Sequence, residues 1–175
     1  MESEKRKLLD STHLAVLEMG IEACYPAVMT DLVSPDVAGF GTALDEKVFG
    51  IPELEDLIKR QKDQSEGIEI DWKFDILSIH ISSDENSAVF SDDVFLYIRT
   101  EQEPLDMYIR FTMVLEYIEN KWKLVHWHAS KPEQVESEKD TWGIQSWKER
   151  AEILEKEVAE RTGDLVLKNR ELEIE

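Results

Sequence analysis

The spacing of apolar residues changes at Gly67 from a helical period to a period of two. Beyond that point apolar and charged residues alternate, which is typical of strands with one buried face. The alternation runs through four segments, residues 68–81, 88–99, 107–118 and 121–130. In the first segment it changes phase at Leu77, as a β-bulge would cause. Long strands in succession after a helical region predict an α+β domain with an antiparallel sheet.

The region before the strands contains two predicted helices. Apolar residues recur at helical spacing over residues 4–32, and Gly20 or Pro26 is expected to interrupt this helix. Residues 51–60 predict a second helix, because a proline stands in its first turn and acidic residues follow it. The intervening residues 34–50 contain Pro35, Gly39, Gly41 and Gly50 and are predicted to form turns.

The two faces of the last two predicted strands differ in character. The apolar set should face the helices, and it consists of Ile109, Phe111, Met113, Leu115, Val125, Trp127 and Ala129. The opposite set is mixed and consists of Arg110, Thr112, Val114, Glu116, Trp122, Leu124, His126, His128 and Ser130. A face that is too apolar for solvent and too polar for a core predicts contact with another subunit. We therefore expect a homodimer with Arg110, His126 and His128 in its interface.

Two features of these strands could carry chemistry. His126 and His128 share one strand face and could bind a metal, but the sequence indicates no third or fourth ligand. Packed interface histidines are therefore favoured and no metal is predicted. Asp92 has the same parity as Phe90 and Val94, which makes it a candidate pocket acid. The alternative is an aspartate at a strand end beside a bulge.

The composition disfavours several classes of function. A formal net charge of −19 disfavours binding to nucleic acid or to an anionic membrane surface. Cys24 is the only cysteine, which excludes an intramolecular disulfide and disfavours a thiolate zinc site. The N-terminal residues contain no apolar run long enough for a signal peptide or a membrane span. These features predict a cytoplasmic protein that needs no cofactor.

The last hairpin and an upstream segment resemble the SnoaL-like branch of the nuclear-transport-factor-2-like superfamily. The upstream segment is Phe40-Gly41-Thr42-x-x-Asp45-Glu46, and the hairpin comprises Arg110-x-Thr112-x-Val114-Leu115 and residues 121–132, KWKLVHWHASKP. The hairpin is also similar to that of the association domain of calmodulin-dependent kinase. The resemblance covers about residues 5–132.

The resemblance implies a cone-shaped domain, in which a curved sheet wraps around helices, encloses a pocket and dimerises through its surface. It does not fix a reaction, since members include isomerases, cyclases, dehydratases and non-catalytic modules. No catalytic residue is assigned; Asp92 and Tyr25 are the only pair that could be nominated. Met113 and Ala129 stand where the kinase association domain carries arginines, which disfavours anionic ligands.

A small, largely apolar or weakly polar ligand is therefore expected in the pocket. The residues predicted to contact it are Tyr25, Trp72, Asp92, Phe111, Met113 and Trp127. For Trp72 and Trp127 a simple core position is the alternative, because lone aromatic residues in strands are commonly buried there.

Residues 142–175 carry a different pattern, which predicts a long helix that pairs in parallel with a copy of itself. Its seam residues recur at spacings of four and three, the rule for coiled coils, and are Trp147, Ala151, Leu154, Val158, Thr162, Leu165, Asn169 and Leu172. The doubled spacing of four around Val158 and Thr162 is a stutter, which locally unwinds a supercoil. Residues 133–141 are predicted to be a linker. The alternative is a single amphipathic helix that folds back on the domain.

The pattern from Leu154 to Glu173 resembles the connecting helix that precedes output domains in bacterial sensor histidine kinases and class III nucleotide cyclases. The chain is therefore expected to be the N-terminal part of a signal-transduction protein. Residues 1–132 would sense a ligand, and the coiled coil would relay its state to an output domain. Glu175 stands where the kinases commonly carry an aromatic residue, which favours an adenylate or guanylate cyclase over a histidine kinase. A SnoaL-like isomerase or dehydratase, or a pure association domain, is the alternative.

Overall fold

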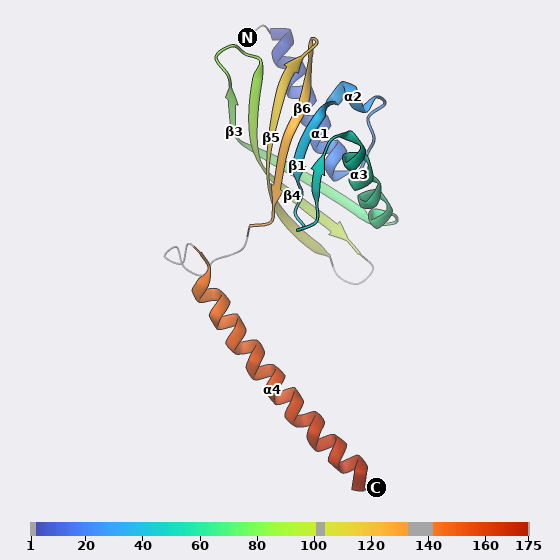
Figure 1. Cartoon of the computed structure of the whole chain (residues 1–175), viewed down its shortest axis with the longest axis vertical. Helices are drawn as coiled ribbons and strands as arrows, with labels where there is room; N and C mark the ends of the chain where they lie inside the picture. The colour runs from blue at the N-terminus through green and yellow to red at the C-terminus, as the bar shows by residue number, and fades with distance from the viewer. Residues whose placement is uncertain (1–2, 101–103, 133–141, 175) are drawn as a thin grey trace. The chain divides into compact units, whose positions relative to one another are not determined.

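The computed structural model describes residues 3–100, 104–132 and 142–174 of the 175-residue chain (Figure 1). The chain divides into two compact units, Met1–Pro132 and Glu133–Glu175. The first unit contains three helices and a six-stranded sheet, and the second contains one helix. The predicted linker, residues 133–141, lies outside the described residues.

The sheet of the first unit has the strand order β2-β1-β6-β5-β4-β3. The strands are β1 Val33–Phe40, β2 Lys47–Phe49, β3 Glu69–Ile81, β4 Ser87–Arg99, β5 Leu105–Ile118 and β6 Lys121–Ser130. The four strands predicted from the alternation are confirmed as an antiparallel meander from β3 to β6.

The predicted all-antiparallel sheet needs one correction, because β1 pairs with β6 in parallel. The same finding corrects the turn-rich interpretation of residues 34–50, which contain both β1 and β2. Pro35 and Gly39 lower the strand propensity of β1, and its register against β6 is irregular between Val33 and Ala38. Pairing with a strand about 90 positions later along the chain overrides this weak local preference.

Two β-bulges set which side chains face the interior. The predicted bulge at Leu77 is confirmed by a register shift between Ile76 and Ser78 in the β3–β4 pair. A second bulge at Val125 shifts the register of β6 against β5. It reverses the parity of the first half of β6, so Trp122 and Leu124 are buried rather than on the outer face as predicted.

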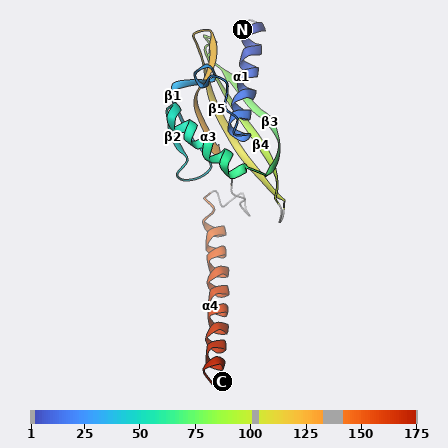
Figure 2. The same cartoon turned by 90° about the vertical axis from the view of Figure 1, so that its right-hand side faces the viewer.

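Three helices lie on the concave side of the curved sheet (Figures 1 and 2). They are α1 Ser3–Ile21, α2 Met29–Leu32 and α3 Ile51–Ser65. The predicted interruption of the first helical region is confirmed, since α1 ends at Ile21 and α2 begins at Met29. Helices α1 and α2 pack against β6, and α3 packs against β1 and β2. The expected curved sheet around helices is thus confirmed.

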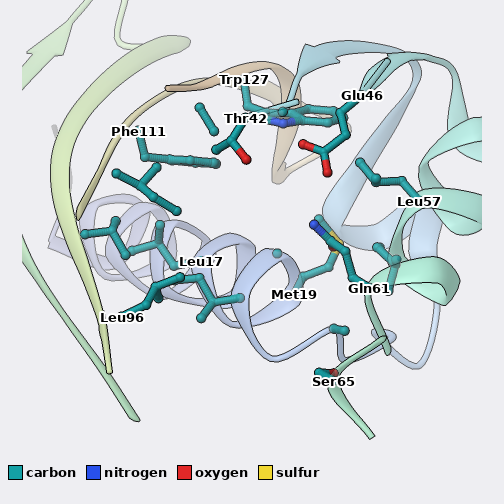
Figure 3. Close-up of a pocket in the computed structure, with 18 of the residues that line it drawn as sticks. Leu17, Met19, Thr42, Glu46, Leu57, Gln61, Ser65, Leu96, Phe111 and Trp127 are labelled. Carbon is teal, nitrogen blue, oxygen red and sulfur yellow. The ribbon is translucent and has the colours of Figure 1, made fainter. Parts of the chain in front are cut away.

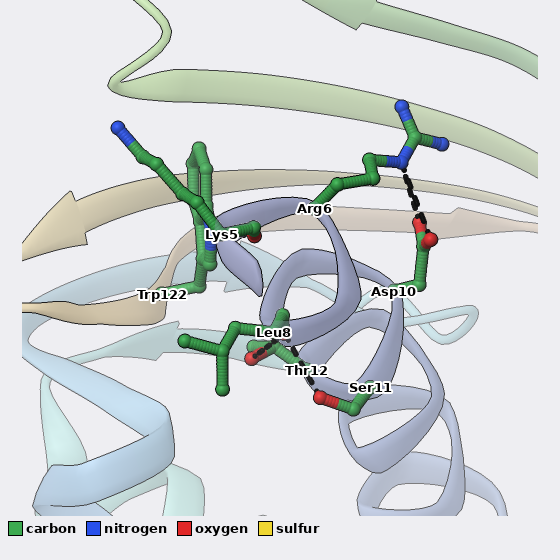
Figure 4. Close-up of polar contacts among 7 residues, drawn as sticks. All are labelled: Lys5, Arg6, Leu8, Asp10, Ser11, Thr12 and Trp122. Atoms are coloured by element: carbon green, nitrogen blue, oxygen red, sulfur yellow. Dashed lines mark hydrogen bonds and ion pairs between the residues drawn. The ribbon is translucent and has the colours of Figure 1, made fainter. Parts of the chain in front are cut away.

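The N-terminal half of α1 is fixed on the sheet by Trp122 (Figure 4). The indole Nε1 of Trp122 donates to the carbonyl oxygen of Lys5 at 3.1 Å, and the Lys5 ammonium lies 4.1 Å from the centroid of the Tyr117 ring. Along the helix, Thr12 Oγ1 donates to the carbonyl oxygen of Leu8 at 2.8 Å. The inward position of Trp122, a consequence of the second bulge, is what makes this contact possible.

The second unit contains helix α4, Ile144–Ile174, with 31 residues. Every α4 side chain that the structure describes is exposed, including the predicted seam residues Leu154, Val158 and Leu165. The side chains of Asn169 and Leu172 lie outside the described part. Pairing of α4 with a second copy therefore stays a prediction. Among the described helices, none is long and apolar enough to cross a membrane.

Candidate functional site

A cavity of about 350 Å³ lies between helices α1 and α3 and the concave face of the sheet. Most of its wall is apolar (Figure 3). The labelled apolar wall residues come from α1, α3 and three strands, and are Leu17, Met19, Leu57, Leu96, Phe111 and Trp127. A hydrophobic enclosure of this size is typical of sites for small molecules.

Polar groups gather at one end of the cavity. Thr42 and Glu46 come from the loop between β1 and β2, and Gln61 comes from α3. In Figure 3 the Glu46 carboxylate points into the cavity and the Gln61 amide faces it from the opposite side. Gln64, Ser65 and Lys131 are the other polar wall residues in the described part of the chain. The cavity thus combines an apolar body with one hydrogen-bonding end.

Two glycines in and after β1 make room for the two most distinctive wall residues. A Cβ atom on Gly39 would lie 2.1 Å from the Trp127 ring, so only glycine allows the indole to lie flat over β1. A Cβ atom on Gly41 would lie 2.2 Å from Oε2 of Glu46. The spacing of two residues places both glycines on one face of the strand. The sequence Gly39-Phe40-Gly41 therefore shapes this wall of the cavity.

The loop that carries Glu46 is held by its own hydrogen bonds. The backbone N–H of Gly41 donates to the carbonyl oxygen of Glu46 at 2.8 Å. The backbone N–H of Ala43 donates to Glu46 Oε2 at 2.9 Å. Because one carboxylate oxygen is tied to the loop, the orientation of the carboxylate is fixed before any ligand arrives.

Of the six residues predicted to contact a ligand, Phe111 and Trp127 line the cavity. Met113 has no exposed surface and belongs to the core. Trp72 Nε1 donates to Glu22 at 2.8 Å, and the Tyr25 hydroxyl donates to the carbonyl oxygen of Glu55 at 2.9 Å. None of these three is among the described wall residues. Whether any of the predicted residues binds a ligand stays a prediction.

Asp92, the sixth predicted residue, is buried and paired with a histidine. Its Oδ2 lies 2.9 Å from Nε2 of His13 on α1, and the His13 ring stacks on Phe90 with centroids 4.1 Å apart. Oδ1 of Asp92 has no hydrogen-bond partner among the described residues. The Asp92–His13 pair joins α1 to β4 inside the core, and Asp92 and Tyr25 have different partners.

The prediction from sequence missed Thr42, Glu46 and Gln61 as wall residues. Glu46 stands in the segment that carried the family resemblance, but the neighbouring glycines indicated a turn. The usable signal was Gly39-x-Gly41 followed by a carboxylate, because glycines at alternate strand positions mark a close approach of another group. Gln61 gave no signal, since its position in α3 becomes a cavity wall only through tertiary packing.

Neither metal ligands nor a reactive thiol emerge from the described residues. Within them no group of three or more His, Cys, Asp or Glu side chains could hold a metal ion. His126 and His128 lie beside the Phe40 ring, with centroids 6.2 and 6.1 Å away.

Partial desolvation, and then the nearby carboxylates of Glu22 and Glu18, raise the pKa of the exposed Cys24 thiol. A raised pKa leaves less thiolate at neutral pH, which makes Cys24 a poor nucleophile.

The outer face of the sheet mixes aromatic and charged side chains. Arg110 and His128 are exposed, and His126 is half-buried. Further along this face the rings of Phe95 and Tyr108 stack with centroids 5.3 Å apart. The mixed composition matches the predicted interface, and contact with another subunit stays a prediction.

Comparison with known proteins identifies related folds. The family model of the SnoaL-like domain matches residues 14–134. No curated protein sequence matches the chain. A domain of unknown function with a cystatin-like fold from Nostoc punctiforme superposes with a TM-score of 0.64 at 7% identity, and 94% of this chain and 98% of that chain are covered.

Two further solved structures match about three quarters of this chain. A ketosteroid isomerase-like protein from Erwinia carotovora has a TM-score of 0.60 at 15% identity, covering 76% of this chain and 100% of that one. The CaMKII hub of S. rosetta has a TM-score of 0.54 at 16% identity, covering 72% and 95%. Identities this low establish a shared fold and nothing about activity.

Proposed function

The chain belongs to the SnoaL-like domain family, and we propose that its first unit binds a small, largely apolar molecule and assembles into a homodimer. The observation that carries the proposal is the cavity of about 350 Å³. Its volume lies within the range of roughly 300–1,000 Å³ that small-molecule sites occupy. Its apolar wall would exclude water from a ligand, and its few polar groups would orient that ligand.

A binding role is favoured over catalysis by the chemistry of the wall. Among the described wall residues Glu46 is the one carboxylate, and it faces the amide of Gln61, which cannot exchange a proton with it usefully. The buried pair of Asp92 and His13 is separate from this wall. A cavity with one fixed carboxylate suits recognition better than a two-group acid–base reaction.

A SnoaL-like isomerase or dehydratase is the second candidate. Glu46 supports it, because a single positioned carboxylate can act as a general base in a proton shift. Replacement of Glu46 by Gln would abolish turnover in an isomerase, whereas a binding module would show no turnover with either residue.

Assembly would use the mixed outer face of the sheet. Its half-buried aromatic rings and its histidines are suited to the rim and core of a polar interface. The similarity to a CaMKII hub supports oligomerisation. Arg110, His126 and His128 are the residues that we propose at this contact.

Helix α4 would carry the signal of the bound state as a parallel coiled coil. Its support is the exposed row of Leu154, Val158 and Leu165 and the stutter around Val158 and Thr162, where two packings of similar energy could exchange. We propose an output domain of the nucleotide-cyclase or histidine-kinase kind and a cytoplasmic location. Deletion of one residue between Val158 and Leu165 should lock or abolish output, and unchanged output would contradict the relay.

Filling the cavity tests the binding role. Leu96→Trp would place an indole in the cavity, whereas Leu77→Trp adds the same group at an exposed bulge and serves as the control. The probe is naphthylethanol, a neutral bicyclic alcohol, and the measurement is the melting temperature of the full chain. A ligand at a hundred times its Kd stabilises the folded state by about 2.7 kcal/mol, which shifts the melting temperature by several degrees.

The wild type and Leu77→Trp should both show this shift, and Leu96→Trp should not. No shift in the wild type, or an equal shift in all three proteins, would contradict binding in the cavity. Because Leu96→Trp fills existing space, we expect it to fold without loss of stability.

A further inference from the structure

The polar end of the cavity carries a defined negative charge. The backbone N–H of Ala43 donates to Oε2 of Glu46 at 2.9 Å and so fixes the position of this oxygen. Because Gly41 has no Cβ atom, the Glu46 side chain can lie against the backbone there. The carboxylate points into the cavity, where Gln61 and Thr42 are its polar neighbours (Figure 3). An amide or a hydroxyl can donate a hydrogen bond to a carboxylate but cannot neutralise it.

A carboxylate at an apolar wall favours a cationic partner over a neutral one. Removal of an ionised group from water costs free energy unless a counter-charge replaces the water. Trp127 borders the same space, and its ring face attracts cations. The net charge of −19 adds a field that raises the local concentration of cations and repels anions.

Lys131 is the one basic residue in the described wall, and it acts against this preference. It is exposed and directly follows β6. An exposed lysine side chain can keep its ammonium in water, whereas Glu46 is held in place by the loop. The fixed charge should dominate recognition because its position requires no ordering when a ligand binds.

We propose that the cavity selects a molecule with an apolar, ring-sized body and one protonated amine, and that Glu46 binds the amine. The proposal rests on the proposed function, in which the cavity binds a small molecule. It assigns the apolar wall to the body of the ligand, Trp127 and Glu46 to its charged end, and Gln61 and Thr42 to the remaining hydrogen bonds.

Three probes of one shape and different charge test the proposal. Naphthylethylamine is cationic, naphthylethanol is neutral and naphthylacetate is anionic at neutral pH. Binding of each to the full chain is measured by titration calorimetry at fixed salt. The variants are Glu46→Gln, which removes the wall charge and keeps the size, and Asp45→Asn, which removes an exposed charge next to it. A charge-assisted hydrogen bond predicts that the amine binds about tenfold more tightly than the alcohol.

The expected result is an amine preference over the alcohol in the wild type and in Asp45→Asn that disappears in Glu46→Gln. Equal binding of all three probes, or tightest binding of the acid, would overturn the proposal and leave the binding role intact. An equal loss of preference in both variants would also overturn it, because the general field would then be the cause. Binding of none of the probes to the wild type would refute the proposed function itself. Absence of the amine preference in the wild type overturns the proposal without any variant, and the comparison of Glu46→Gln with Asp45→Asn separates the Glu46 carboxylate from the general field.

Discussion

The unit of residues 1–132 and helix α4 place their apolar side chains in opposite ways. In the first unit Leu17 and Phe90 expose 1% and 0% of their surface. In α4, Val158 and Leu165 expose 63% and 62%. Both segments have regular apolar patterns in sequence. Within the first unit the helices and the sheet cover this pattern, whereas the described side chains of α4 have no cover within the second unit.

The difference shows what each pattern needs in order to be stable. The helices on the concave side of the sheet cover the apolar side chains of the strands, so this unit contains its own core. A helix without buried side chains gains little from packing and is marginal in water. The apolar row of α4 can therefore stabilise the helix only if another surface covers it. The spacing of fours and threes favours a second copy of α4 as that surface.

Among the substitutions that test this difference between the two regions, Asp92→Ala in the core should lower the stability of the chain most. The change leaves the buried His13 without the partner that now lies 2.9 Å away. Breaking a buried pair of this kind costs about 3–5 kcal/mol. Urea unfolding of the full chain measures the loss, and Asp164→Ala on the exposed α4 is the control, with no measurable change expected. Similar stabilities of the two variants would show that the Asp92–His13 pair does not hold α1 to the sheet.

Leu165→Ala should have a smaller effect, and it should weaken the association of two chains rather than the folding of one. If Leu165 is covered by a second copy, its truncation removes about 1.5 kcal/mol of apolar burial per chain. Val166→Ala is the matched control, because Val166 is its neighbour outside the predicted seam. Sedimentation equilibrium should show weaker dimers for Leu165→Ala alone. Equal weakening by both variants would contradict the predicted seam.

The smallest effects should come from glycine-to-alanine changes, which are expected to have opposite signs in the two regions. Gly39→Ala forces a methyl group against the Trp127 ring and should destabilise the first unit by about 1 kcal/mol. Gly163 has nothing within 4 Å of an added Cβ atom, so Gly163→Ala should stabilise α4 by about 1 kcal/mol. Thermal unfolding followed by circular dichroism measures both. Stabilisation by Gly39→Ala would mean that the close approach of Trp127 to β1 is not required.

Local patterns predicted much of the first unit. The strands β3 to β6 and the bulge at Leu77 followed from alternation, and the SnoaL-like domain followed from the hairpin sequence. Strand β1 was missed because its parallel partner β6 lies far along the chain, and its glycines and proline indicate turns. The bulge at Val125 was missed because Trp122 and Leu124 alternate as regularly as the residues that follow them.

The polar end of the cavity was not predictable in the same way. A cavity forms where packing leaves space, and no periodicity in one segment reports the space between three elements. Phe111 and Trp127 were predicted because inward aromatic residues are candidates for any pocket. Glu46 and Gln61 come from a loop and a helix that meet only in the folded unit.

Amide hydrogen exchange at different protein concentrations tests the central contrast most directly. Protection of α1 and α3 should be independent of concentration, because their core lies within one chain. Protection of α4 should fall on dilution, because the helix would lose its partner. Protection of α4 that is strong at every concentration while the chain is monomeric would contradict the account, since it would show that α4 is stable without a second copy.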